Sequence, residues 1–305
     1  MKGARSEERG ASREEAVGKM STLSPILTPR SSLLAPLIWR GLVWIGIGFF
    51  VLNVVALIAA VVVDSFATRW LGTWLPSAFT LRWYGSAWSE FQLDSVLMVT
   101  VEVVLAVVVI SLLVGVPAAY ALARRNFRFK RIVLLLFVLP LLVPPMTYGI
   151  PLATVLYSLH LAGTINGVIL ANLVPAVPFV ILVMTPFVEQ IDPRLEAAAR
   201  VLGAGTLRIF LHILVPLLAP GILAAGLLVL VRTIGMFELT FLTSGSDSQT
   251  LVVALYYTVF AAGVRAGQSI DAMAVIYMVT ALIPLVIALR FVDPTQLVTR
   301  VKSER

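Results

Sequence analysis

Long apolar runs separated by short charged segments make up most of the chain beyond residue 40. A helix needs about 20 apolar residues to cross a hydrocarbon core of about 30 Å. A shorter apolar run, 251–264, predicts a re-entrant or amphipathic helix instead of a span. The longer runs predict six transmembrane helices, over residues 41–63, 96–122, 132–159, 167–188, 213–231 and 272–289.

The composition indicates that lipid is the solvent for much of this surface. Of the 305 residues, 59% are hydrophobic and 13% are charged, whereas soluble chains average about 45–50% apolar and about 25% charged residues. The predicted fold class is therefore an all-α integral membrane protein. The chain has no cysteine, which excludes thiolate chemistry. With His160 and His212 as its two histidines, no metal site is expected.

Lysine and arginine gather in alternate segments between the apolar runs. Residues 1–40 hold seven of them, 123–131 hold five, 189–212 hold three and 290–305 hold four, which together are 19 of the 23. The positive-inside rule then predicts that both termini lie in the cytoplasm and that residues 64–94 form an external loop. Because this topology accounts for the net charge of +7, no nucleic-acid partner is expected.

The predicted spans divide the chain into four parts. Residues 1–37 lack the apolar stretch of a cleavable signal and predict a disordered cytoplasmic tail. Residues 38–94 hold the first transmembrane helix and the external loop. Residues 95–292 hold the other spans as one core domain, and residues 293–305 predict a second cytoplasmic tail.

The segment between the fourth and fifth spans predicts two short helices that meet at a glycine. Asp192 suits an N-cap and Pro193 the first helical position. Residues 194–202 then form an alanine-rich helix that Gly203 ends in a left-handed conformation, and Thr206 caps a second short helix. Such a knob is suited to dock in a groove of a partner. The alternative is a connecting loop that happens to be helical.

This segment resembles the EAA loop of permeases from bacterial binding-protein-dependent ATP-binding-cassette (ABC) importers. The family pattern is Glu-Ala-Ala, three residues and Gly, with a proline further on. One departure is that the glutamate of the pattern falls on Ala197, while the acid present, Glu196, lies one place earlier. The matching residues are Ala198, Ala199, Gly203, Ala204 and Pro216.

The resemblance extends over roughly residues 95–290, through the segments 117–124, 127–131 and 139–145. It implies a MetI-like permease fold in a multi-pass protein of the bacterial inner membrane. It also implies three kinds of partner besides lipid: a second permease, two ATPase subunits and an external solute-binding protein. The coupling residues that it implies, all within 189–212, are Asp192, Glu196, Ala198, Ala199, Arg200, Gly203 and Ala204.

The chain has no GxxxxGK[ST] phosphate loop. By the same resemblance, ATP and Mg²⁺ are expected on the partner ATPase, with no cofactor on this chain and no enzymatic activity of its own. The rival functions are an ion-coupled secondary transporter, for which the halves show no convincing repeat, and a membrane enzyme, for which no catalytic arrangement stands out.

Ionisable groups inside spans are costly and usually face a cavity or a partner. A carboxylate beside aromatic rings suits a cationic solute, through charge pairing and cation–π attraction. The alternative for Glu238 is an interfacial position or a pair with Arg232, and the alternative for Glu102 is a subunit interface or a water-facing position. The candidate residues of the solute path are Phe237, Glu238, Tyr256, Tyr257 and Glu102.

Prolines concentrate in the third and fourth spans, where each removes a backbone donor. They indicate either a flexible gate or fixed kinks that packing stabilises. The prolines are 140, 144, 145, 151, 175, 178 and 186.

The external approach Leu81–Tyr84 and the Pro-Pro pair of the third span resemble the polyamine and ferric-iron branches of the family. Together with Glu238 they favour a polyamine or another small cationic solute. Sugar and opine importers remain open.

Overall fold

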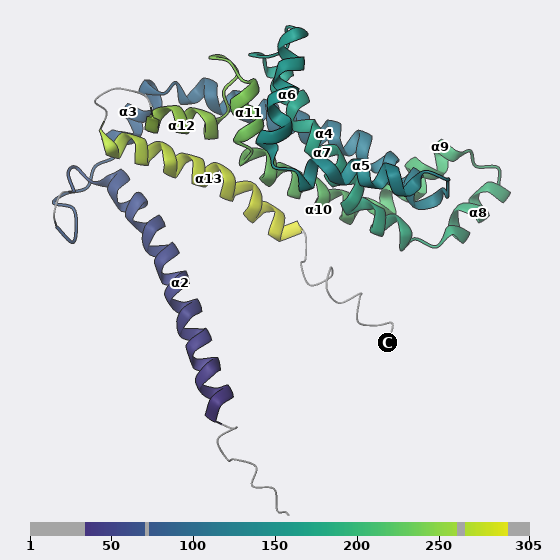
Figure 1. Cartoon of the computed structure of the whole chain (residues 1–305), viewed down its shortest axis with the longest axis horizontal. Helices are drawn as coiled ribbons and strands as arrows, with labels where there is room; N and C mark the ends of the chain where they lie inside the picture. Colours follow the sequence, from purple (N-terminus) through teal and green to yellow (C-terminus); the bar gives the residue numbers. More distant parts are fainter. Residues whose placement is uncertain (1–33, 71–72, 261–265, 292–305) are drawn as a thin grey trace, which may run out of the picture. The chain divides into compact units, whose positions relative to one another are not determined.

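The computed structural model describes residues 34–70, 73–260 and 266–291. Within these ranges the regular structure is helical, apart from one isolated antiparallel bridge between Ala67 and Phe79. Figure 1 gives the helix labels used below. Among the residues that the structure describes, five helical segments are long and apolar enough to cross a membrane, or six if the bent pair α5 and α6 is one span. The all-helical prediction is confirmed, and the predicted six spans match the upper count.

The long helices follow the predicted apolar runs, each extended by a few residues. They are α2 (Leu34–Phe66), α4 (Leu93–Arg124), α7 (Ile165–Glu189), α10 (Val215–Ile234) and α13 (Gly267–Phe291). Shorter helices lie between them, namely α3 (Arg82–Glu90), α8 (Pro193–Val201), α11 (Glu238–Thr243) and α12 (Leu251–Phe260). With 10 residues α12 is too short to span, as predicted; residues 261–264 of that prediction lie outside the described residues.

The third predicted span is two helices, α5 (Lys130–Leu142) and α6 (Pro145–Ser158), which meet at 101°. The prolines of the predicted run 132–159 thus break it into two helices, as expected of prolines within a span. The break lies at Val143 and Pro144, which both have extended backbone, because a residue that precedes proline is driven out of the helical region. In contrast, α7 continues through its three prolines, which agrees with fixed kinks in that helix.

The fifth span is longer than predicted. It begins as α9 (Thr206–Ile209), passes through a π-helical turn, η2 (Phe210–Leu214), and continues into α10, so that residues 206–234 form one helical segment. The second short helix predicted at Thr206 is thus the beginning of the fifth span. Thr206 is not its cap either, because Gly205 occupies the N-cap position and no side chain caps this end.

The chain divides into two compact units within α2, between Ile58 and Ala59. In the first unit the apolar side chains Trp39, Ile45 and Phe50 are exposed. An 18-residue apolar window of α2 has no buried residue within this chain. A helix of this kind requires lipid or another protein as its surroundings.

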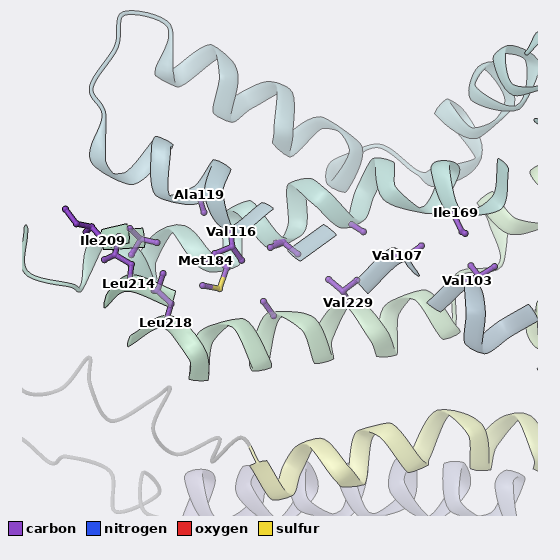
Figure 2. Close-up of a cluster of buried hydrophobic side chains, with 14 of the residues drawn as sticks. Val103, Val107, Val116, Ala119, Ile169, Met184, Ile209, Leu214, Leu218 and Val229 are labelled. Carbon is purple, nitrogen blue, oxygen red and sulfur yellow. The ribbon is translucent and has the colours of Figure 1, made fainter. Parts of the chain in front are cut away.

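The main core of the second unit lies between α4, α7 and α10. Its fully buried side chains include Val107 of α4, Met184 of α7 and Ala225 of α10. Figure 2 shows this cluster continuing to Ile209 and Leu214, where the fifth span begins. The segment between α7 and α10 is therefore anchored in the same core as the long helices.

Candidate coupling segment and solute path

The segment 189–212, called the coupling segment below, begins as predicted. The carboxylate of Asp192 accepts a hydrogen bond from the backbone N–H of Arg194 at 2.9 Å, and Pro193 is the first residue of α8. A side-chain cap of this kind satisfies a backbone donor that has no partner within the helix. Both sequence assignments are confirmed.

Gly203 ends α8 with φ of +82°, in the left-handed region that was predicted for it. Its N–H donates to the carbonyl of Arg200 at 2.9 Å, and the N–H of Ala204 donates to the carbonyl of Ala199 at 3.0 Å. This pair of bonds is a Schellman motif, which satisfies the last carbonyls of a helix while the chain reverses. In Figure 1 α8 and α9 lie together beyond the ends of α7 and α10.

The outer surface of the coupling segment is apolar. Val201 and Leu202 are each 88% exposed, and Leu195 and Leu207 are also exposed. Exposed apolar groups that cluster on a small protrusion indicate a surface that another protein covers. Of the predicted coupling residues, the exposed ones are Asp192, Ala198, Arg200 and Gly203.

The remaining predicted coupling residues face the chain itself. Ala199 is buried in the main core and Ala204 is half-buried against it. Glu196 is only 4% exposed. Its carboxylate accepts hydrogen bonds from Arg124 Nε and from the hydroxyl of Tyr120, each at 2.7 Å.

Sequence reasoning missed Tyr120 and Arg124 as partners of Glu196. The sequence shows that Arg124 is a basic residue at the end of the second span, but nothing local connects it to Glu196, which lies 72 residues later in the chain. Arg124 also donates from Nη2 to the carbonyl of Ile191 at 2.7 Å. The end of α4 thus holds the coupling segment at two points.

The candidate path residues from α11 and α12 come together as an aromatic cluster. The ring of Phe237 lies 4.9 Å from that of Tyr256 and 5.1 Å from that of Phe241. Tyr256 also contacts Phe260 at 4.6 Å, and Tyr257 lies 5.8 Å from Phe241. Ring pairs at these separations are mutually stabilising.

The charged candidates are placed separately. Glu238 is half-buried in the first turn of α11, and no ion pair joins it to Arg232 among the described residues. The predicted alternative of a Glu238–Arg232 pair is therefore wrong in this structure. Glu102 is exposed on α4, and its place on a solute path stays a prediction.

Arg232 lies at the end of α10 with its guanidinium 5.5 Å from the ring centre of Phe179. It lines a small pocket between α7 and α10 together with Asn172 and Thr233. The amide of Asn172 donates to Thr240 Oγ1 at 3.2 Å, which fixes its orientation. Positive charge and amide or hydroxyl groups therefore meet at one point between two spans.

The family to which this architecture belongs follows from comparison with known proteins. The sequence profile of the family described as binding-protein-dependent transport system inner membrane component matches residues 111–297. The chain belongs to this family. Its members are membrane permease components of ABC importers, and the predicted permease identity is thereby confirmed. The orientation of the termini stays a prediction.

Two relatives illustrate the range of the family. A probable molybdenum ABC transporter permease protein of Haloferax volcanii is 31% identical over 245 residues, which cover 76% of this chain and 84% of the relative. The sulfoquinovosyl glycerol transport system permease protein of Agrobacterium fabrum is 34% identical over 160 residues, and the match covers 52% of this chain and 56% of the relative.

A solved structure supports the fold. A bacterial ABC transporter involved in the import of alginate superposes with a TM-score of 0.68 at 19% identity, covering 88% of this chain and 99% of that chain. Relatives with molybdenum or sugar-transport names are among the matches. The expected resemblance to the polyamine and ferric-iron branches finds no support in these comparisons.

Proposed function

We propose that this chain is the transmembrane permease subunit of an ATP-driven solute importer and that the coupling segment docks into a groove of a cytoplasmic ATPase. The observation that carries this proposal is the protruding helix–glycine–helix unit, whose exposed apolar residues include Val201 and Leu202, in a chain of the importer family. ATP and Mg²⁺ bind to that ATPase. A second permease completes the solute path, and an external binding protein delivers the solute.

The docking surface is small and apolar. Val201 is the last residue of α8 and Leu202 follows it, while Leu207 lies in the first turn of the next helix. A side chain of this size contributes about 1.5–3 kcal/mol when a partner buries it fully. These side chains therefore supply the binding free energy, while the Schellman turn at Gly203 fixes their position.

The test of ATPase docking is recovery of partners from the native cell through a tag on this chain, in mild detergent. The wild-type chain is expected to recover an ATPase and a second permease. Val201→Asp with Leu202→Asp is expected to lose the ATPase and retain the second permease. The matched control is Trp74→Asp, at a position that is 98% exposed in the loop predicted to be external, and it should retain both partners. Recovery of the wild-type chain alone would contradict the proposal.

The solute class that fits best is an oxyanion such as molybdate. Arg232 supplies positive charge without a carboxylate partner among the described residues, and Asn172 and Thr233 line the same pocket. A guanidinium suits the oxygens of a tetrahedral anion. The amide of Asn172 and the hydroxyl of Thr233 already donate within the chain, so Arg232 carries this assignment. The molybdenum permease relative of Haloferax volcanii, which aligns with 76% of this chain, supports the same class.

A sugar is the second candidate, because the cluster around Phe237 and Tyr256 offers aromatic faces, and because relatives with sugar-transport names match about half of the chain. The cationic solute expected from Glu238 lacks support from these relatives.

Arg232→Gln separates the oxyanion from the sugar as the transported solute. Uptake of molybdate by the native cell should fall steeply in Arg232→Gln, and less in Arg232→Lys, which keeps the charge. The same change at Arg82, outside the long spans, serves as the control. Unchanged molybdate uptake in Arg232→Gln would contradict the oxyanion assignment.

A further inference from the structure

The acid of the coupling segment, Glu196, lies on a different side of α8 from the position where the family pattern places a glutamate. Ala197, which occupies the pattern position, is exposed, whereas Glu196 is buried. One residue along an α-helix turns a side chain by about 100°. The shift by one place therefore moves the carboxylate from the partner side of α8 to the side that packs on this chain.

The carboxylate of Glu196 is fully engaged within this chain. One oxygen accepts from Arg124 Nε at 2.7 Å, and the other accepts from the Tyr120 hydroxyl at 2.7 Å. Arg200, four residues along α8, adds a weaker ion pair at 3.6 Å. A buried carboxylate with charge-assisted bonds on both oxygens is held firmly in place and has no acceptor turned toward a partner.

The same end of α4 contacts both sides of the coupling segment. Arg124 binds the carbonyl of Ile191 at 2.7 Å, where the chain enters the segment. The Tyr120 ring lies 5.6 Å from that of Phe210, where the chain leaves it. Glu196 lies between these two points. Any movement of α8 that preserves these bonds must therefore move the end of α4.

Directional bonds differ from apolar contacts in the force they transmit. Van der Waals contacts resist compression but weaken quickly when surfaces separate. Short charge-assisted hydrogen bonds also resist separation. Because α4 packs along α7 and α10 in the main core, a pull on α8 through Glu196 would reach the helices of the solute path.

We infer that the Glu196–Arg124 pair is the link that passes movement of the coupling segment to α4, and that Glu196 is a positioning residue that does not contact the ATPase. This inference rests on the proposed function. It divides the segment into an outer apolar surface that binds the ATPase and an inner ionic link that moves the span.

The experiment uses assemblies purified from the native cell through a tag on this chain. A single cysteine replaces Met98, which is 70% exposed and lies at the other end of α4 from Arg124, and carries a spin label. The native chain has no cysteine. Spin labelling of the wild-type assembly therefore measures the background signal from cysteines of the partner subunits. Label mobility is compared before and after addition of ATP, Mg²⁺ and vanadate, together with ATPase recovery and hydrolysis rate.

Glu196→Gln is expected to reduce the nucleotide-dependent change of the label by about fivefold or more. ATPase recovery and hydrolysis should stay close to those of the wild type. Asp247→Asn removes a carboxylate from an exposed position outside the coupling segment and should leave the label response unchanged. A merely structural role for Glu196 would instead lower recovery, hydrolysis and label response together.

Glu196→Gln leaves Arg124 without its partner, and misfolding could then also abolish the label response. A second variant separates these two explanations. Arg124→Met with Glu196→Met removes both charges and keeps side chains of similar length, which buried pairs commonly tolerate. It should fold and still lose the label response. A normal response in either variant would overturn the inference alone, as would loss of the ATPase in Glu196→Gln but not in Asp247→Asn. If the wild-type assembly contains no ATPase, the proposed function falls and the inference falls with it.

Discussion

The hydroxyl of Thr100, on α4, accepts a hydrogen bond from the backbone N–H of Leu251, the first residue of α12, at 2.8 Å. The same hydroxyl donates to the carbonyl of Val96 at 2.7 Å. Thr100 is buried, and Leu251 is fully buried beside it. A side chain of a long span therefore caps a short helix 151 residues further along the chain.

Thr100→Val is expected to loosen the beginning of α12. Valine has nearly the same shape as threonine but leaves the buried N–H of Leu251 without an acceptor, which costs about 1–3 kcal/mol. Amide hydrogen exchange at Leu251 should accelerate by about tenfold or more, while exchange in the middle of α7 stays the same. Thr100→Ser keeps the hydroxyl and should retain the protection. Equal protection in the valine and serine variants would contradict the cap.

Gly115 of α4 lies in close contact with α7. A Cβ atom at this position would lie 2.6 Å from Cγ1 of Val180 and 2.8 Å from its Cβ. Because valine is branched at Cβ, it cannot rotate away from such a contact. Gly115→Ala is therefore expected to destabilise the protein by about 1–3 kcal/mol, as overpacking does.

Val180→Ala should relieve this contact in part, because it removes Cγ1 but keeps the Cβ atom. The double variant Gly115→Ala with Val180→Ala is expected to have a higher thermal midpoint in detergent than the two single effects predict when summed, because the residues are in direct contact. Gly46→Ala is the control, since nothing lies within 4 Å of its Cβ position. Additive effects of Gly115→Ala and Val180→Ala would show that the two helices separate instead.

Much of this fold is predictable from the sequence, because bilayer thickness dictates the length of the apolar runs. The predicted run 167–188 and the observed α7 differ by no more than two residues at either end. The break before α6 is also marked by Pro144 and Pro145, although the angle of the bend depends on packing that a single sequence does not display. Caps within one turn, such as Asp192, follow from local chemistry.

Contacts between distant segments were beyond sequence reasoning. Nothing local connects Glu196 to Arg124, and the π-helical turn that joins α9 to α10 leaves no recognised signal. Thr206 was mistaken for a cap because a threonine before an apolar run suits that role, whereas here Gly205 takes it. The aromatic residues Phe237 and Tyr256 were correctly placed together, although their contact with solute stays a proposal.

Gly203 and Gly205 form a matched pair within one turn. Neither has an atom within 4 Å of its Cβ position, so a methyl group meets open space at both. Their backbones differ, with φ of +82° at Gly203 and −72° at Gly205. Gly203→Ala should cost about 1–2 kcal/mol for the left-handed conformation, whereas Gly205→Ala should cost less, about 0.5–1 kcal/mol for the weaker N-cap.

The consequence for docking can be measured as ATPase recovered per tagged chain. Gly203→Ala should lower it, because relaxation of the turn displaces Val201 and Leu202, and Gly205→Ala should not. Gly203→Asn should lie between them, since asparagine tolerates the left-handed region better than alanine does. Equal recovery in both alanine variants would show that the turn geometry does not matter for docking.

Tyr148 and Tyr120 offer a second matched pair, in which removal of a hydroxyl has opposite consequences. The Tyr148 hydroxyl, on α6, is buried and has no hydrogen-bond partner among the described residues. The Tyr120 hydroxyl donates to Glu196 at 2.7 Å. A hydrogen bond to a charged group contributes about 1.5–3 kcal/mol, whereas an unsatisfied buried group costs about 1–3 kcal/mol.

Tyr120→Phe is therefore expected to lower the thermal midpoint in detergent, and Tyr148→Phe to leave it unchanged or raise it. Tyr157→Phe, at an exposed position on α6, should leave the midpoint unchanged. A loss of stability in Tyr148→Phe would mean that its hydroxyl has a partner in the folded protein.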